Sequence, residues 1–258
     1  MRKYFLTALS ALVLAVPATT SAQITLPGCV RPATLTAPFV FVAVNGQCTD
    51  LSSLVAPVVG GKGWSLSTKL SLASATIDLH ALFNPDPSVT FGGTTTNTTS
   101  AATTYAFLFG LPIVPDFYSS ALSTLHLSAT SVTGTTTVAN SATYPAFVSG
   151  YGTVGDELTN LGVDLGTGTC VASGTAASAT CDLGSASSSF APTFYDNLEA
   201  LVTYTQDNAA STVTFSGEVT IGAADVVTTT PEPATLVLVG IGLLVLGGTI
   251  RKHPRRLD

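Results

Sequence analysis

Two histidines are the only imidazole groups in the long central part of the chain, and they are the first candidates for catalysis. Asp78 and His80 are separated by one residue, so an extended strand would place both side chains on the same face. Serine is abundant, so the residue types of a Ser-His-Asp site are all present. Such a site is recognised by the geometry of its side chains and not by composition. No Gly-x-Ser-x-Gly elbow supports it. We interpret His80 and His126 as solvated or core-edge histidines and predict no catalytic residue.

An acidic segment is the one candidate for metal binding. Calcium prefers six to eight oxygen ligands, and oxygen-bearing side chains gather here at Asp156, Glu157, Asn160 and Asp164. Their spacing does not match the EF-hand loop. An ordinary acidic loop is therefore the favoured interpretation, with a calcium site as the alternative, and we assign no metal or cofactor.

The segment 150–155 fits the pattern Gly-x-Gly-x-x-Gly. A nucleotide-binding loop of this kind needs a preceding strand, a following helix and an acidic residue about twenty positions later. No such unit surrounds it, and Tyr144-Pro145 comes shortly before. We predict a flexible loop.

The four cysteines fall into two local pairs, Cys29 with Cys48 and Cys170 with Cys181. An even count in an exported chain favours disulfides, and four cysteines allow three pairings. We favour the two local ones, each stabilising by about 2–4 kcal/mol in the chain-entropy model. A zinc site is not indicated, because the chain has no Cys-x-x-Cys and no nearby histidine.

The C-terminal end carries the strongest signals. Residues 234–250 contain no charged side chain and ten Leu, Val or Ile, about the minimum length for a membrane-spanning helix. A basic cluster follows, and such a cluster stays in the cytoplasm and leaves the preceding chain outside. Its members are Arg251, Lys252, Arg255 and Arg256.

A rigid tripeptide precedes this span. Pro231 and Pro233 fix their own φ and disfavour helix in the residue before each, so Glu232 is presented on an extended segment. Proteases and transpeptidases commonly bind substrates in this form.

This tail resembles the PEP-CTERM sorting signal of Gram-negative bacteria. The resemblance is carried by Pro231, Glu232, Pro233, Ala234 and Thr235, the glycine-containing apolar run and the basic cluster, and it covers about the last thirty residues. Valine often precedes the motif in that family, whereas Thr230 stands here. The resemblance implies that an exosortase, a membrane-embedded cysteine transpeptidase, processes the chain and that it is exported alongside extracellular polysaccharide. It implies a substrate of that enzyme, not an enzyme.

The N-terminal end agrees with export. Arg2 and Lys3 precede an apolar run over 4–16, and small residues follow. This order is typical of a secretory signal peptide. We predict residues 1–22 as the signal peptide, with cleavage after Ala18 as the alternative to Ala22.

The body, residues 23–228, is acidic and poor in helix-forming residues. Thirteen Asp and Glu against Arg31, Lys62 and Lys69 give a formal charge near −10. Such a surface argues against nucleic-acid partners. Thr, Ser, Ala, Gly and Val dominate, which favours strands over helices.

Hydrophobic periodicity predicts an all-β body. Residues 39–44 form a continuous apolar run typical of a buried strand, whereas 64–72, 77–83 and 213–221 alternate as half-buried strands do. We expect a break at 84–87, further breaks at Pro112 and Pro115, and a loop or exposed edge in the Thr-rich segment 94–104. The pattern predicts a β-sandwich, jelly-roll-like or Greek-key.

We therefore predict a non-enzymatic exported protein of the cell surface or matrix, with domains 1–22, 23–228 and 229–258. In that tail the motif occupies 231–235, the helix 234–250 and the basic end 251–256. The expected partners are an exosortase, the inner membrane before processing, and extracellular polysaccharide. The alternatives are a carbohydrate-binding module, with or without calcium, and a secreted hydrolase.

Overall fold

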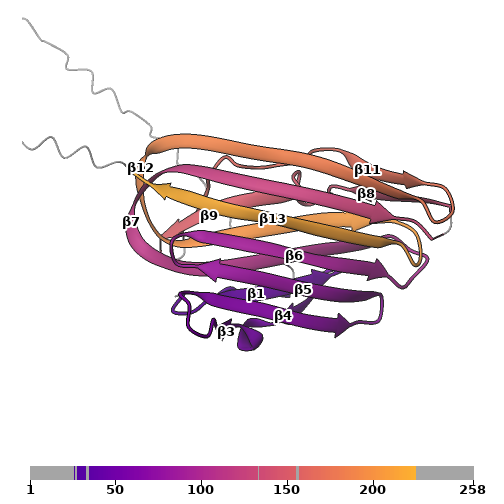
Figure 1. Cartoon of the computed structure of the whole chain (residues 1–258), viewed down its shortest axis with the longest axis horizontal. Helices are drawn as coiled ribbons and strands as arrows, with labels where there is room; N and C mark the ends of the chain where they lie inside the picture. The colour runs from indigo at the N-terminus through magenta and orange to yellow at the C-terminus, as the bar shows by residue number, and fades with distance from the viewer. Residues whose placement is uncertain (1–25, 27, 33–34, 133, 155–156, 225–258) are drawn as a thin grey trace, which may run out of the picture. The chain divides into compact units, whose positions relative to one another are not determined.

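The computed structural model describes residues 26, 28–32, 35–132, 134–154 and 157–224. These residues form an all-β body in which the hydrogen-bonded strands join into one large antiparallel sheet (Figure 1). The predicted signal peptide, the C-terminal helix and the sorting motif lie outside the described residues.

Thirteen strands and one short 3-10 helix make up the body. They are β1 (Phe39–Val44), β2 (Gln47–Asp50), η1 (Ser52–Leu54), β3 (Ala56–Pro57), β4 (Trp64–Ser71), β5 (Ala75–Asn84), β6 (Ser88–Asn97), β7 (Thr103–Thr130), β8 (Thr135–Ala139), β9 (Val148–Val154), β10 (Glu157–Asn160), β11 (Thr169–Ser173), β12 (Ser178–Gln206) and β13 (Thr212–Ala223).

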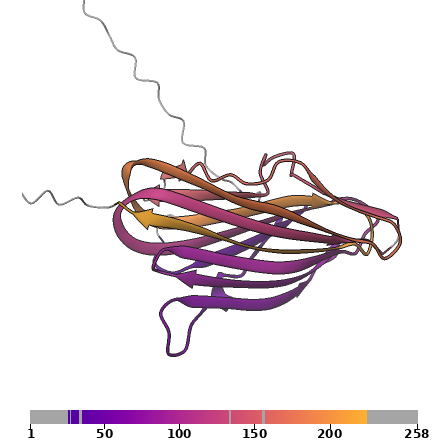
Figure 2. The same ribbon diagram turned by 45° about the horizontal axis from the view of Figure 1, so that its top comes forward.

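Two very long strands fold this sheet back on itself. β7 and β12 run antiparallel over 28 and 29 residues, and register shifts fall between Ser189 and Thr193 and between Tyr195 and Asn197. Bulges bend strands in this way. The sheet therefore has two facing layers, which Figure 2 shows from a second direction.

The first layer joins β2, β1, the first part of β7, the last part of β12, β9 and β10. The second layer joins the first part of β12, the last part of β7, β13, β6, β5, β4 and β3. β8 and β11 pair antiparallel, and β8 attaches to the end of β12. A sandwich-like arrangement is thus confirmed.

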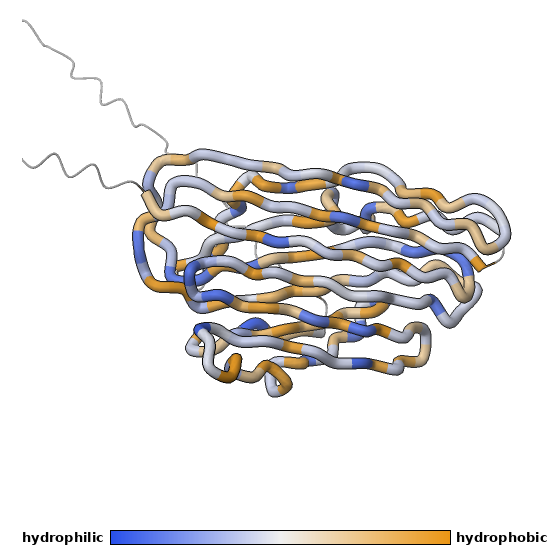
Figure 3. Tube along the Cα trace, in the orientation of Figure 1, coloured by the Kyte–Doolittle hydropathy of each residue, from blue (hydrophilic) through white to orange (hydrophobic). Residues whose placement is uncertain are grey.

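Aromatic side chains fill the space between the layers. Phe91 of β6 stacks on Phe109 of β7 with centroids 5.4 Å apart, and Phe107 meets Phe215 of β13 at 5.0 Å. All four are fully buried. The alternation of apolar and polar residues along the second layer, visible in Figure 3, sends one side of each strand into this core.

The outer side of the first layer, called here the covered face, is also apolar. Phe39, Phe41, Leu108 and Leu201 are buried there beneath an N-terminal strap, whose described residues are 26, 28–32 and 35–37. A strand that is buried on both sides has a continuous apolar sequence, and this explains why every residue of β1 is apolar.

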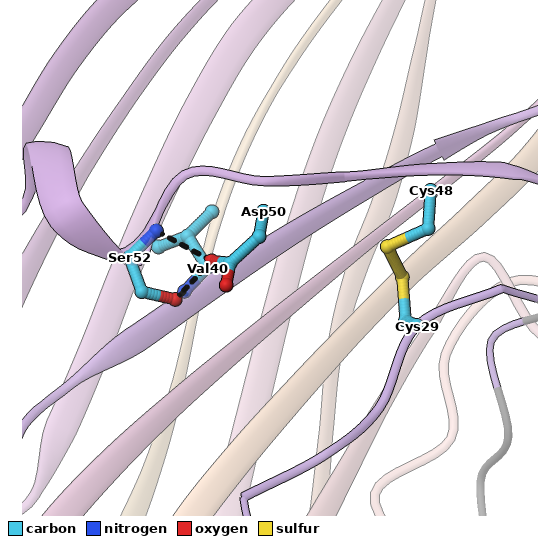
Figure 4. Close-up of a disulfide and its surroundings, with 5 residues drawn as sticks. All are labelled: Cys29, Val40, Cys48, Asp50 and Ser52. Atoms are coloured by element: carbon cyan, nitrogen blue, oxygen red, sulfur yellow. Dashed lines mark hydrogen bonds between the residues drawn. A yellow bond between two sulfur atoms is a disulfide. The ribbon is translucent and has the colours of Figure 1, made fainter.

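A disulfide and a hydrogen-bonded turn hold this region. Cys29 of the strap is bonded to Cys48 of β2, with Cα atoms 5.3 Å apart (Figure 4). Nearby, the Ser52 hydroxyl donates to Asp50 Oδ1, and the Val40 amide donates to Ser52 Oγ. Cys170 pairs with Cys181. Both disulfides match the pairing that the sequence favoured.

Three local predictions were wrong in whole or in part, although residues 98–102 of the Thr-rich segment do form a loop. Residues 94–97 belong to β6, which lies between β5 and β13, because Thr95 turns inward and bonds the buried Tyr204 hydroxyl at 2.8 Å. Residues 150–154 belong to β9, where a Cβ on Gly152 would lie 2.6 Å from the Tyr195 ring. The strand β7 continues through Pro112 and Pro115 and bends there.

Candidate functional site

The outer side of the second layer, called here the open face, carries a row of side chains contributed by six strands. Strand pairing aligns Ser67, His80, Gly92, Ser216, His126 and Asp182 across β4, β5, β6, β13, β7 and β12. These positions alternate with core positions, so register alone brings the two histidines onto one face.

A shallow groove of about 570 Å³ follows this row. Its polar lining comes from hydroxyl, imidazole and carboxylate side chains, and its apolar part includes the side chain of Leu82, which is 55% exposed. The polar residues are Ser65, Ser67, His80, Thr90, Thr124, His126, Ser216 and Glu218.

Gly92 makes room for one imidazole. A Cβ at this position would lie 2.4 Å from His80 Nε2, so the ring of His80 extends over the glycine. The absence of a side chain at the centre of the row therefore leaves space that the His80 ring occupies.

The second imidazole is held by a carboxylate that sequence reasoning missed. His126 Nδ1 lies 3.0 Å from Asp182 Oδ1, and both side chains are more than half exposed. Ser216 is the strand neighbour of His126 on the other side. The 55 residues between His126 and Asp182 gave no local signal, because only the β7–β12 register pairs them.

This order, Asp182, His126, Ser216, is that of a hydrolytic triad, but its surroundings differ. No hydrogen bond joins His126 to Ser216 among the described residues. β13 is paired on both sides, by β6 and β7, so the amides beside Ser216 are used in the ladder. The backbone N–H groups beside Ser216 are therefore not free to form an oxyanion hole.

Threonine pairs extend the polar surface beyond the groove. Thr94 and Thr214 hydroxyls are 3.2 Å apart, and those of Thr96 and Thr212 are 3.3 Å apart. Cross-strand pairs of this kind stabilise a sheet modestly. The open face is thus a rigid surface of hydroxyl groups with a groove.

The predicted acidic segment is only partly placed. Glu157 is exposed in β10, and the Asn160 amide donates to both carboxylate oxygens of Asp164 at 3.2 and 3.0 Å. Asp156 lies outside the described residues. No cluster of three or more His, Cys, Asp or Glu suited to a metal occurs in the described part of the chain, and the calcium site stays a prediction.

The covered face contains a buried ion pair. Arg31 Nε donates to Glu199 Oε1 at 2.6 Å, and the Glu199 side chain is fully buried. Burial raises the pKa of Glu199, and the Arg31 guanidinium offsets part of this rise. Arg31 Nη2 and Glu199 Oε2 have no hydrogen-bond partner among the described residues. This pair fastens the strap and does not face the groove.

Residues 229–252 match the model of the PEP-CTERM protein-sorting motif. The tail is a PEP-CTERM sorting motif. A PEP-CTERM tail marks an exported, membrane-anchored precursor that an exosortase processes and that is sorted to the cell surface. No curated protein matches the chain.

The PEP-CTERM motif covers none of the body, so the groove is not part of the matched family. Pro231 to Thr235 and the basic cluster lie outside the described residues, and their individual roles stay predictions. Among the residues that the structure describes, no helix is both long and apolar enough to cross a bilayer.

Proposed function

We propose that this chain is a non-enzymatic surface or matrix protein of a Gram-negative bacterium, carrying its β-sandwich to the outside of the cell. In this proposal residues 1–22 are the signal peptide, 23–228 the exported body and 229–258 the sorting tail, with a membrane helix over 234–250. The observation that carries it is the PEP-CTERM match at 229–252. Association with extracellular polysaccharide is part of the proposal.

The open face supports a role without catalysis. An imidazole–carboxylate pair whose side chains are 60% and 65% exposed, without free backbone amides beside Ser216, is poorly placed to stabilise an oxyanion. A wide polar surface is better suited to contact with a hydrated matrix. A secreted hydrolase using His80 or His126 is the weaker alternative, and we expect no loss of any hydrolytic activity when both are changed to alanine.

The sorting claim is tested by deleting Pro231-Glu232-Pro233 in the native host and fractionating the cells. We expect the chain to remain in the membrane with its full C-terminal mass, because the exosortase no longer recognises it. Deletion of Val226-Val227-Thr228, just before the motif, is the matched control and keeps the motif intact. Normal release and an unchanged mature mass after removal of the motif would refute the claim.

A carbohydrate-binding role is the second candidate, and the groove of the open face favours it. Hydroxyl, imidazole and carboxylate groups can bond sugar hydroxyls, and Leu82 offers an apolar contact. A glycan array with and without a chelator tests this role and its calcium dependence. We expect Ser216→Trp to fill the groove and abolish binding, with Thr76→Trp, elsewhere on the open face, as control. Equal signal on all glycans would remove this candidate.

A further inference from the structure

One end of the sandwich exposes apolar side chains in unusual number. It is the end where β7 and β12 bend and where β13 stops (Figure 1). Five side chains there, here called the apolar tip, are among the exposed large hydrophobic residues of the body: Val59, Val114, Phe117, Val154 and Phe194.

The apolar tip is built from several strands. Phe117 and Phe194 meet edge to face with centroids 5.8 Å apart, at the point where β7 pairs with β12. Val114 shares a cavity of about 770 Å³ with Trp64 and Pro85. Val114 is 63% exposed and Phe117 53%, so most of their surface faces water.

The opposite end of the sandwich has a different composition. Its turns, 73–74, 98–102 and 207–211, contain Ala, Ser, Thr, Asp and Asn. None of these turn residues is an exposed large hydrophobic side chain. The turn between β7 and β8 at this opposite end does carry Val132, which is 48% exposed, but among the described residues the exposed Phe side chains, Phe117 and Phe194, occur only where the strands bend.

The chain leaves the body at the apolar tip. Ala223, the last residue of β13, pairs with Tyr118, which is adjacent to Phe117. The ten residues 224–233 lie between this strand and the predicted span, and ten extended residues reach at most about 35 Å. The opposite end lies about 40 Å further along the strands. While the precursor is anchored, only the tip end is confined near the bilayer.

The balance of charge at this end favours one kind of lipid: Lys62 lines the same cavity as Val114 and Asp86, and Asp116 adds a second carboxylate, so negative charge is in excess among these three charged side chains. Asp86 and Asp116 lie close enough to Tyr118 to raise its pKa, behind the larger effect of burial. Carboxylates are repelled by anionic headgroups, which favours a surface without net charge.

We propose that the apolar tip docks on the zwitterionic lipid surface of the membrane that holds the precursor. The inference rests on the proposed anchoring of the tail. Exposed Phe side chains enter the boundary between headgroups and acyl chains, and the short tether of residues 224–233 keeps the tip at a high effective concentration near the membrane. A second copy of the chain is a poorer occupant, because five side chains are far fewer than the 20–30 residues that a stable interface uses on each side.

The test uses the full chain reconstituted through its tail into vesicles of brominated phosphatidylcholine. In a Trp64→Phe background, Phe117→Trp places the only indole at the tip, and Val132→Trp places it outside the tip as the control. We expect brominated lipid to lower the emission at position 117 more than about twofold and to leave position 132 unchanged. Vesicles containing phosphatidylglycerol should quench position 117 less, and Asp116→Asn should restore the quenching.

Each other outcome has a definite meaning. Equal emission at position 117 in brominated and ordinary lipid, in protein that floats with the vesicles, overturns docking and leaves the anchored tail intact. Protein that does not float with the vesicles overturns the anchoring and docking together. If Phe117→Ser with Phe194→Ser lowers the oligomeric state in detergent and position 117 is not quenched, the tip binds a second copy instead. Near-UV circular dichroism checks that each variant is folded.

Discussion

The covered face and the open face belong to one folded sheet, yet their outward side chains differ. On the covered face the outward residues of β1 are Phe39, Phe41 and Ala43, and a disulfide-bonded strap lies over them. On the open face the outward residues of β5 include Asp78 and His80, and they meet water. The contrast teaches that the hydrophobicity of a strand's outward residues indicates whether another segment of the chain covers them. Apolar side chains left in water would cost free energy.

Removal of Arg31 tests the covered face most severely. Arg31→Ala leaves the Glu199 carboxylate buried without its cation, so we expect a loss of about 3–5 kcal/mol in the free energy of unfolding at pH 7. Urea unfolding measures it. Lys69→Ala is the open-face control: its partner Asp78 is 2.9 Å away but exposed, so the loss should stay below about 1 kcal/mol.

The effect of Arg31→Ala should also depend on pH. Burial holds the pKa of Glu199 above its ordinary value of 4.5, so the folded state binds the proton more tightly than the unfolded state. Stability from this group is present below pH 4.5 and is lost as the pH rises towards the folded pKa. Without Arg31 the folded pKa rises further, so the loss at pH 7 should exceed that at pH 4. A loss independent of pH would show that Glu199 is not responsible.

Breaking the strap's disulfide comes second. Cys29→Ser with Cys48→Ser opens a loop with a sequence separation of 19, for which chain entropy predicts a loss of about 3 kcal/mol. The Cys170–Cys181 pair, with a separation of 11, should cost nearly as much. Hydrogen exchange separates the two variants: only the first should expose amides of β1. Equal protection of β1 in both would contradict a covering role for the strap.

A pair of glycine substitutions compares the faces directly. A Cβ on Gly110 would lie 1.9 Å from the buried Phe39 ring, so Gly110→Ala should cost about 1–3 kcal/mol through overpacking. A Cβ on Gly92 meets the exposed His80 ring, which can swing into water, so Gly92→Ala should cost less. Thermal unfolding of the two variants tests this, and a reversed order would refute the distinction between the faces.

The smallest effect is expected in the groove. His126→Ala removes an imidazole–carboxylate contact whose partners are 60% and 65% exposed, and exposed contacts of this kind contribute below about 1 kcal/mol. Asp182→Asn should give the same small change in thermal unfolding. A much larger loss in either variant would mean that the open face is covered in the native protein.

Sequence patterns predicted the strands well where one side of the strand is exposed to solvent and the other is buried. The alternation in 213–221 became β13, and the Asn-Pro-Asp-Pro break at 84–87 became the turn between β5 and β6. The Thr-rich segment failed because small polar residues are typical of both loops and strands. Only pairing with β5 and β13 on either side identifies 94–97 as a central strand.

The candidate site was the least predictable part. His80 and His126 were visible as rare side chains, but Asp182 and Ser216 were two among many Asp and Ser residues. Their row depends on register between strands that lie far apart in the chain, and a shift of one residue would turn each side chain to the other face.

The sequence by itself determined the sorting motif at 229–252, the β character of the body and the local pairing of its cysteines. Those features depend on neighbouring residues, through periodicity, rigid prolines and short loops. The tertiary structure alone decided that β7 and β12 bend and continue through Pro112 and Pro115, that one face is covered and the other open, and that apolar side chains gather where the chain leaves the body. These features depend on the hydrogen-bond register between strands that are distant in the sequence. Local sequence patterns do not indicate that register.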